Sequence, residues 1–163
     1  SISLEFIQIN SDGEEKSGLI KIKRPGKLRI EYNAPSDLLI VSDGLKFAVI
    51  NQKLESITLY SQSQIPINPF LKNNFLISNY EILNYIERNN TIDVELTQSS
   101  NYLEGSLRLI FEKNPFNLKK WIIKSKDGSK TEMYIMNIVK NSEFSINDFK
   151  KFDPRKIPFG RKD

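Results

Sequence analysis

The chain has 163 residues, of which 39% are hydrophobic and 27% charged, proportions typical of a folded globular domain with a sizeable core. It contains neither cysteine nor histidine, which excludes disulfides, thiolate chemistry and every catalytic or metal-binding arrangement that requires an imidazole. The net charge of +4 lies entirely in a basic tail, residues 150–163, because residues 1–149 carry 18 basic and 18 acidic side chains. Nucleic-acid binders usually spread positive charge over their folded surface, so we expect no nucleic-acid partner.

Apolar runs separated by turn signals predict six strands in the first 60 residues. Arg24-Pro25-Gly26-Lys27 places Pro and Gly at the two central positions of a sharp turn. Asp43-Gly44 is one of the stronger short-range signals for a hairpin. The expected strands are 3–9, 19–23, 28–32, 38–42, 46–50 and 54–60.

The strand pattern breaks after residue 60. Two prolines, Pro66 and Pro69, exclude a central strand there. Asn68 as an N-cap and Pro69 as the first helical residue predict a short helix from Pro69 to Asn74, with Ile67, Phe70 and Leu71 on its apolar face. Five more strands are expected at 82–88, 92–96, 105–112, 118–126 and 131–138, followed by a second short helix at 146–149. The pattern therefore predicts about eleven strands in up-and-down order within a single domain.

So many strands allow two interpretations of the apolar side chains. They fill a solid sandwich core, or they line the concave side of a curved, incompletely closed sheet that the short helix covers. The candidate lining residues are Leu28, Ile30, Tyr32, Leu38, Ile40, Phe47, Val49, Ile57, Leu59, Leu107, Leu109, Phe111 and Trp121.

Catalytic signals are weak. Asp43 and Glu31 are carboxylates, but a turn explains the first and a solvated strand face the second, and Ser42 next to Asp43-Gly44 also belongs to a turn. No nucleophile elbow, phosphate-binding glycine loop or dinucleotide fingerprint is present in the sequence. We expect no enzymatic activity, no cofactor and no metal.

Several segments together resemble the LolA family, the periplasmic carriers of outer-membrane lipoproteins. The segments are I-K-R-P-G-K-L-R-I-E-Y at 22–32, A-P at 34–35, I-V-S-D-G at 40–44, P-I-N-P-F-L at 66–71, Phe6, Gln8 and Leu107 to Phe111. The resemblance covers most of residues 2–150 and implies an unclosed, antiparallel eleven-stranded half-barrel with a short helical lid over an apolar cavity. That cavity would hold acyl chains against the candidate lining residues, beneath a lid that contains Ile67, Phe70 and Leu71.

The resemblance also implies residue roles and partners. Arg24 matches the family arginine that hydrogen-bonds the lid backbone and stabilises the closed, empty form. The expected partners of this periplasmic, monomeric carrier in a Gram-negative bacterium are acylated lipoproteins, an inner-membrane lipoprotein-releasing ABC transporter and an outer-membrane acceptor. Members usually begin with a helix, which this sequence lacks before its first strand, and the basic tail at 150–163 matches the family weakly. The alternatives are an outer-membrane acceptor or a lipoprotein sensor of the same fold, and a structural β domain that binds no lipid.

Overall fold

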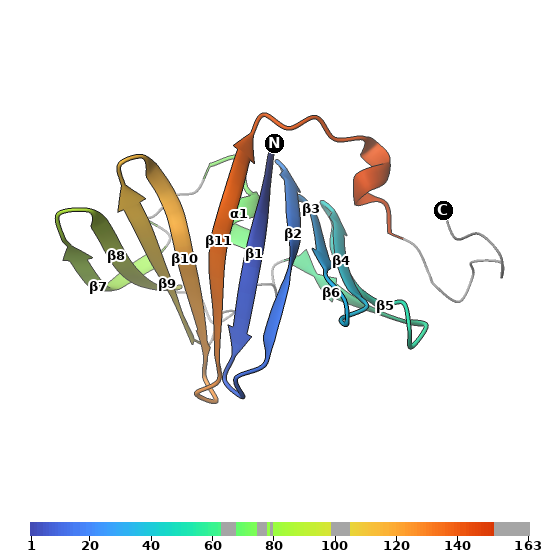
Figure 1. Ribbon diagram of the computed structural model, residues 1–163, viewed down its shortest axis with the longest axis horizontal. Coiled ribbons are helices and arrows are strands. Elements are labelled where there is room, and N and C mark those ends of the chain that lie inside the picture. Colours follow the sequence, from blue (N-terminus) through green and yellow to red (C-terminus); the bar gives the residue numbers. More distant parts are fainter. Residues whose placement is uncertain (63–67, 75–77, 79, 99–104, 152–163) are drawn as a thin grey trace. The chain divides into compact units, whose positions relative to one another are not determined.

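The computed structural model describes residues 1–62, 68–74, 78, 80–98 and 105–151. Eleven antiparallel strands form one unclosed sheet, as expected from the sequence (Figure 1). The strands before helix α1 (Asn68–Leu71) are β1 (Ile2–Asn10), β2 (Glu15–Lys23), β3 (Lys27–Tyr32), β4 (Leu38–Asp43), β5 (Lys46–Asn51) and β6 (Ser56–Ser61). Those after it are β7 (Tyr80–Glu87), β8 (Thr91–Gln98), β9 (Gly105–Lys113), β10 (Phe116–Ser125) and β11 (Lys130–Lys140).

The strand order explains why the sequence pattern breaks after residue 61. The order in the sheet is β6-β5-β4-β3-β2-β1-β11-β10-β9-β8-β7, so β6 and β7 are its two edges although they follow one another in the chain. The segment that connects the two edges contains the short helix α1 (Asn68–Leu71). A second, 3₁₀ helix, η3 (Ile146–Phe149), follows β11. Within the described residues, no helix is long and apolar enough to cross a membrane.

Several predicted boundaries were wrong, and the second strand begins at Glu15 and not at residue 19. The sixth strand begins at Ser56 because Gln52 to Glu55 form a turn, at which the Leu54 N–H donates to Asn51 Oδ1 over 2.9 Å. Helix α1 begins at Asn68, so Asn68 lies inside the helix and is not its cap, and it ends at Leu71 and not at Asn74. It stops there because the last two helical carbonyls, of Phe70 and Leu71, accept hydrogen bonds from outside the helix.

The chain forms two compact units. Unit 1 comprises residues 1–3, 18–73 and 139–163, and unit 2 comprises residues 4–17 and 74–138. Unit 1 therefore holds β3 to β6, α1 and η3, and unit 2 holds β7 to β10. The single domain expected from the sequence stays a prediction.

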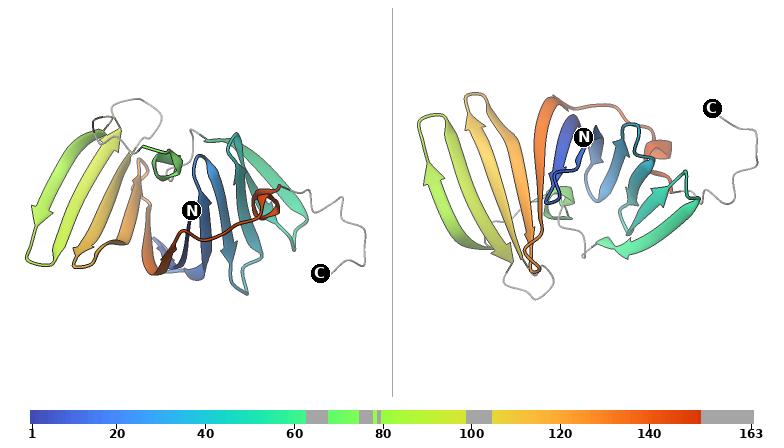
Figure 2. Two further views of the ribbon diagram at one scale, coloured as in Figure 1. Left: turned by 90° about the horizontal axis from the view of Figure 1, so that it is seen from above. Right: turned by 60° about the horizontal axis from the view of Figure 1, so that its bottom comes forward.

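Helix η3 covers one face of unit 1. It lies across β3 and β4 (Figure 2), and its Phe149 side chain is buried. Lys21 Nζ lies 2.9 Å from Asp148 Oδ1, and Arg29 Nη1 donates to the Asp148 carbonyl over 3.2 Å. Ser145 and Asp148 form a capping box at the start of the helix. The sequence prediction of a helix at 146–149 is confirmed, and these contacts attach it to the sheet.

Candidate functional site

Seven of the predicted lining residues lie on one face of unit 1. Directly opposed residues in neighbouring strands share a face, and the register pairs Ile30 with Ile40 and Ile40 with Val49. The same face carries Leu28, whose partner Ser42 pairs with Phe47. We call this set the unit 1 apolar face: Leu28, Ile30, Tyr32, Leu38, Ile40, Phe47 and Val49.

Ile57 and Leu59 do not belong to this face. Ile57 pairs with Ile50, and Leu59 pairs with Ala48, so both side chains point to the face that carries the buried cluster Leu39, Val41, Ala48 and Ile50. Because strand side chains alternate between faces, these two residues cannot line one cavity together with the other seven. Their assignment from the sequence needs correction.

The unit 1 apolar face suits hydrocarbon. Leu28 and Phe47 are fully buried, and Ile40 and Val49 are half-buried. Burial raises the pKa of Tyr32 to about 12, so its phenol stays uncharged at any physiological pH. The face therefore presents no charged group from these seven residues.

In unit 2, all four predicted lining residues share one face. Leu107 pairs with Leu96, Leu109 with Val94, and Phe111 with Ile92. Trp121 pairs with Leu109 on one side and Met133 on the other. We call Leu107, Leu109, Phe111 and Trp121 the unit 2 apolar face. Trp121 is 5% exposed, which makes it a useful fluorescent reporter for this face.

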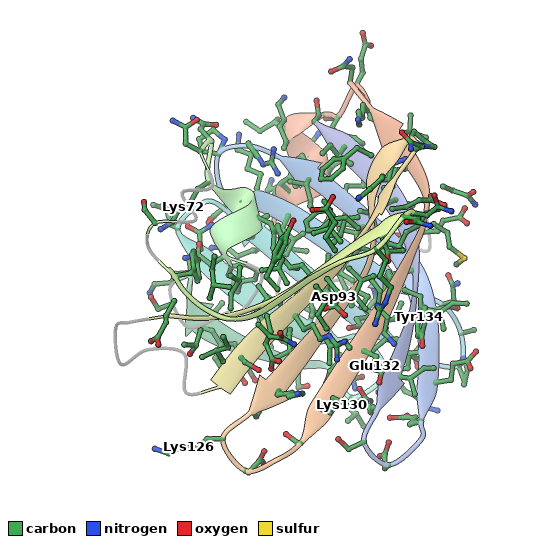
Figure 3. All side chains as sticks on the ribbon, turned by 90° about the vertical axis from the view of Figure 1, so that its left-hand side faces the viewer. Lys72, Asp93, Lys126, Lys130, Glu132 and Tyr134 are labelled. Atoms are coloured by element: carbon green, nitrogen blue, oxygen red, sulfur yellow. The ribbon has the colours of Figure 1, made fainter. Side chains whose placement is uncertain are left out.

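The opposite face of unit 2 is a ladder of ion pairs. Figure 3 shows Lys130, Glu132 and Tyr134 in a row along β11. Glu132 pairs with Lys120 and with Lys130. Hydrogen bonds from these two lysines lower the pKa of Glu132 from 4.5 to about 2. This face is occupied by paired charges and is not suited to a lipid chain.

The lowered pKa of Glu132 predicts an acid-dependent loss of stability. A carboxylate whose folded-state pKa is depressed stabilises the protein above its unfolded-state pKa, and that contribution disappears as the pH falls from about 4.5 toward 2. We expect Glu132→Gln to be less stable than the parent at pH 7, with the difference shrinking toward pH 2. Thermal unfolding between pH 7 and pH 2 measures this. The exposed Glu81→Gln is the control, and a parent–variant difference independent of pH would contradict the prediction.

Arg24 contacts the predicted lid as the family resemblance implied. The Arg24 side chain is exposed, and its Nε donates to the Phe70 carbonyl oxygen over 2.7 Å. Phe70 is half-buried and Leu71 is 1% exposed. Ile67, the third predicted lid residue, lies outside the described residues. The structure thus brings Arg24 together with one of the three predicted lid residues, Phe70.

The neighbouring glycine holds the same helix end. The Gly26 N–H donates to the Leu71 carbonyl over 2.8 Å. Gly26 has φ of 73°, and a Cβ atom there would lie 2.8 Å from Gly44 Cα, so only glycine fits this turn without displacing its neighbour. We call residues 24–26 the corner.

Ser42, Asp43 and Gly44 pack against the corner. Ser42 is fully buried; its hydroxyl donates to the Gly26 carbonyl over 2.9 Å and accepts from the Gly44 N–H over 3.2 Å. Asp43 Oδ1 accepts from the Leu45 N–H over 3.0 Å, which confirms its turn role, and its Oδ2 lies 2.6 Å from Lys151 Nζ. Burial alone would raise the pKa of Asp43, but the hydrogen bonds from Lys151 and from the Leu45 and Lys46 N–H groups outweigh burial, so the pKa is lowered.

The sequence alone does not predict that Ser42 and Gln62 hydrogen-bond the Gly26 carbonyl. Gln62 Nε2 donates to the Gly26 carbonyl over 2.9 Å. Ser42 is a polar residue that ends the apolar run Leu38 to Val41, which is a weak signal that its hydroxyl has a buried partner. Gln62 has no comparable signal, since it belongs to a polar stretch of the chain.

Comparison with known proteins identifies the family. The family model described as outer membrane lipoprotein carrier protein LolA matches residues 1–152. The chain is 25% identical over 159 residues to the outer-membrane lipoprotein carrier protein of Pseudomonas aeruginosa, covering 91% of this chain and 76% of that protein. Several solved structures share its fold. A LolA superfamily protein from Nitrosomonas europaea has a TM-score of 0.51 at 13% identity, over 93% of this chain and 90% of the other. The Pseudomonas aeruginosa MucA/MucB complex contains a chain with a TM-score of 0.53 at 8% identity, over 94% of this chain and 56% of the other. The protein therefore belongs to the LolA family of outer membrane lipoprotein carrier proteins.

Proposed function

We propose that this protein is a periplasmic, non-enzymatic carrier that holds the acyl chains of lipoproteins on its apolar sheet faces and uses α1 as a lid. The carrier receives lipoproteins from an inner-membrane ABC transporter and delivers them to an outer-membrane acceptor. The observation that carries the proposal is the hydrogen bond from Arg24 to the Phe70 carbonyl, found in a chain of a lipoprotein-carrier family.

Physical chemistry supports the need for such a carrier. Exposing hydrocarbon to water costs about 0.8 kcal/mol per methylene, so one acyl chain of about sixteen carbons costs on the order of 12 kcal/mol. A lipoprotein therefore does not cross an aqueous compartment unaided. The unit 1 apolar face offers uncharged side chains from three strands, β3 to β5, which provides the kind of surface that an acyl chain requires.

The proposal predicts that binding depends on the acyl chains. We expect acylated lipoprotein to bind and to change the fluorescence of Trp121, whereas the same lipoprotein without its acyl chains fails to bind. Fluorescence titration of the purified protein in detergent-free buffer measures this. Equal affinity for the two forms would overturn the carrier function and favour a protein-recognition role, and no binding of either form would favour a structural β domain.

The register supplies a matched pair of variants. Val49 is half-buried on the unit 1 apolar face, and Leu59 is exposed on the opposite face. An asparagine amide at position 49 would be desolvated by bound hydrocarbon, so we expect Val49→Asn to weaken acyl-chain binding about tenfold, which is about 1.4 kcal/mol. Leu59→Asn is expected to leave the affinity unchanged. The same loss in both variants would place the binding site elsewhere.

A further inference from the structure

Two hydrogen-bond donors hold the C-terminal end of α1, one from an exposed side chain and one from a buried main chain. The Arg24 guanidinium is exposed and reaches the Phe70 carbonyl from outside. The Gly26 N–H is part of a buried main chain and reaches the Leu71 carbonyl. A four-residue helix leaves its last carbonyls without internal partners, so these two donors act as a C-terminal cap supplied by another segment. A change at Arg24 removes only the first of them.

The second donor needs its own support. Glycine has no Cβ atom to restrict its backbone, so the direction of the Gly26 N–H depends on what holds that residue. Its carbonyl accepts from Ser42 Oγ and from Gln62 Nε2, each over 2.9 Å. Because the Ser42 oxygen also accepts from the Gly44 N–H, its single proton is directed to Gly26.

We propose that Ser42 and Gln62 are positioning residues for the lid: they fix Gly26 so that its N–H holds the Leu71 carbonyl independently of Arg24. The inference rests on the proposed function only in naming α1 a lid. It explains why the K-R-P-G and V-S-D-G segments face one another across two hairpin ends. The first segment supplies both lid donors, Arg24 and Gly26, and the second supplies Ser42, which binds the Gly26 carbonyl.

The Gly26 amide reports on this bond directly. Its proton exchanges with solvent only after it has left the Leu71 carbonyl. Gln62→Glu keeps the size of the side chain and removes the donor, so we expect Gly26 to exchange about five- to tenfold faster. Gln62→Lys retains a donor and should stay within about twofold of the parent. Residue-resolved hydrogen exchange by NMR on the full chain at pH 7 measures both.

The controls separate positioning from packing. Gln52 is exposed in the turn before β6, so Gln52→Glu should not alter exchange at Gly26. Ser42→Ala should accelerate exchange as Gln62→Glu does, whereas amides in β9 and β10 should keep their parent rates. The positioning role is wrong if Gln62→Glu leaves the exchange rate of the Gly26 amide at its parent value. It is also wrong if Gln52→Glu and Gln62→Lys accelerate that exchange as much as Gln62→Glu does.

A combined variant tests whether the two donors hold the same lid. The carbonyls of Phe70 and Leu71 are adjacent in one helix end, so Arg24→Leu alone should accelerate Gly26 exchange, and Arg24→Leu with Gln62→Glu should accelerate it by about the product of the two single effects. A Gly26 exchange rate that Arg24→Leu leaves unchanged would contradict a shared lid. Acyl-chain binding, measured on the same samples, separates this inference from the carrier function. Normal acyl-chain binding with an unchanged Gly26 exchange rate in the variants refutes the inference alone. Faster Gly26 exchange in the variants of a protein that binds no acyl chain refutes the carrier function alone.

Discussion

Arg24→Leu is expected to accept lipoprotein as well as the parent protein but to release it to the acceptor about five- to tenfold more slowly. A carrier releases its cargo because the closed, empty form is stable enough to compete with bound acyl chains. If α1 is the proposed lid, the hydrogen bond from Arg24 Nε to the Phe70 carbonyl is made only in the closed form and stabilises that form alone. A hydrogen bond from a charged group in an exposed position contributes about 1 kcal/mol, which corresponds to that factor in the closed-to-open ratio.

The measurement is transfer of lipoprotein from the loaded carrier to acceptor-containing membranes. Arg24→Lys should restore release only in part, because an ammonium lacks the fixed fork of the guanidinium. Arg88→Leu is the matched control, since Arg88 is an exposed turn residue of unit 2. If Arg24→Leu unloads as fast as the parent protein, Arg24 only flanks a turn. The Gly26 bond remains in this variant, so a complete block of release is not expected.

The strands and the corner were predictable because their signals are local. The Pro-Gly and Asp-Gly pairs fix the turns on either side of β3 and β4 in the chain. The role of Arg24 followed from a resemblance in the K-R-P segment, and the structure shows the expected contact with Phe70. What remained hidden was the support of Gly26 by Ser42 and Gln62, because residues 16 and 36 positions apart from Gly26 meet only in the folded chain.

The error at β6 has a different cause. Alternation in Ser56–Ser61 correctly places Ile57 and Leu59 on one face. It does not say which face, since that depends on the register with β5. Strand β5 is apolar on both faces over Phe47 to Ile50, so its sequence offers no polar side against which to align β6. A one-residue shift in the assumed pairing moves both side chains to the opposite face.

Leu71→Ser is expected to shift the empty protein toward the open form by about a hundredfold. Leu71 is 1% exposed in the structure, and replacing a buried leucine by a small residue costs about 3 kcal/mol. If α1 is a lid, the open form already exposes Leu71, so the variant loses closed-state stability and little else. The free energy of unfolding then falls by no more than the free-energy difference between the closed and open forms, because the open form is still folded. Faster binding of an apolar fluorescent probe to the empty variant would show the opening.

The comparison with Leu109→Ser distinguishes a lid from a core residue. Leu109 is 2% exposed within β9, and its loss should lower the free energy of unfolding by the full cost of a buried leucine, about 3 kcal/mol. Leu71→Ser should lower it clearly less while accelerating probe binding more. Phe70→Ser should show a smaller opening than Leu71→Ser, because Phe70 is only half-buried. If Leu71→Ser destabilises the protein as much as Leu109→Ser and leaves probe binding unchanged, α1 is part of the fixed core and the carrier opens by another element.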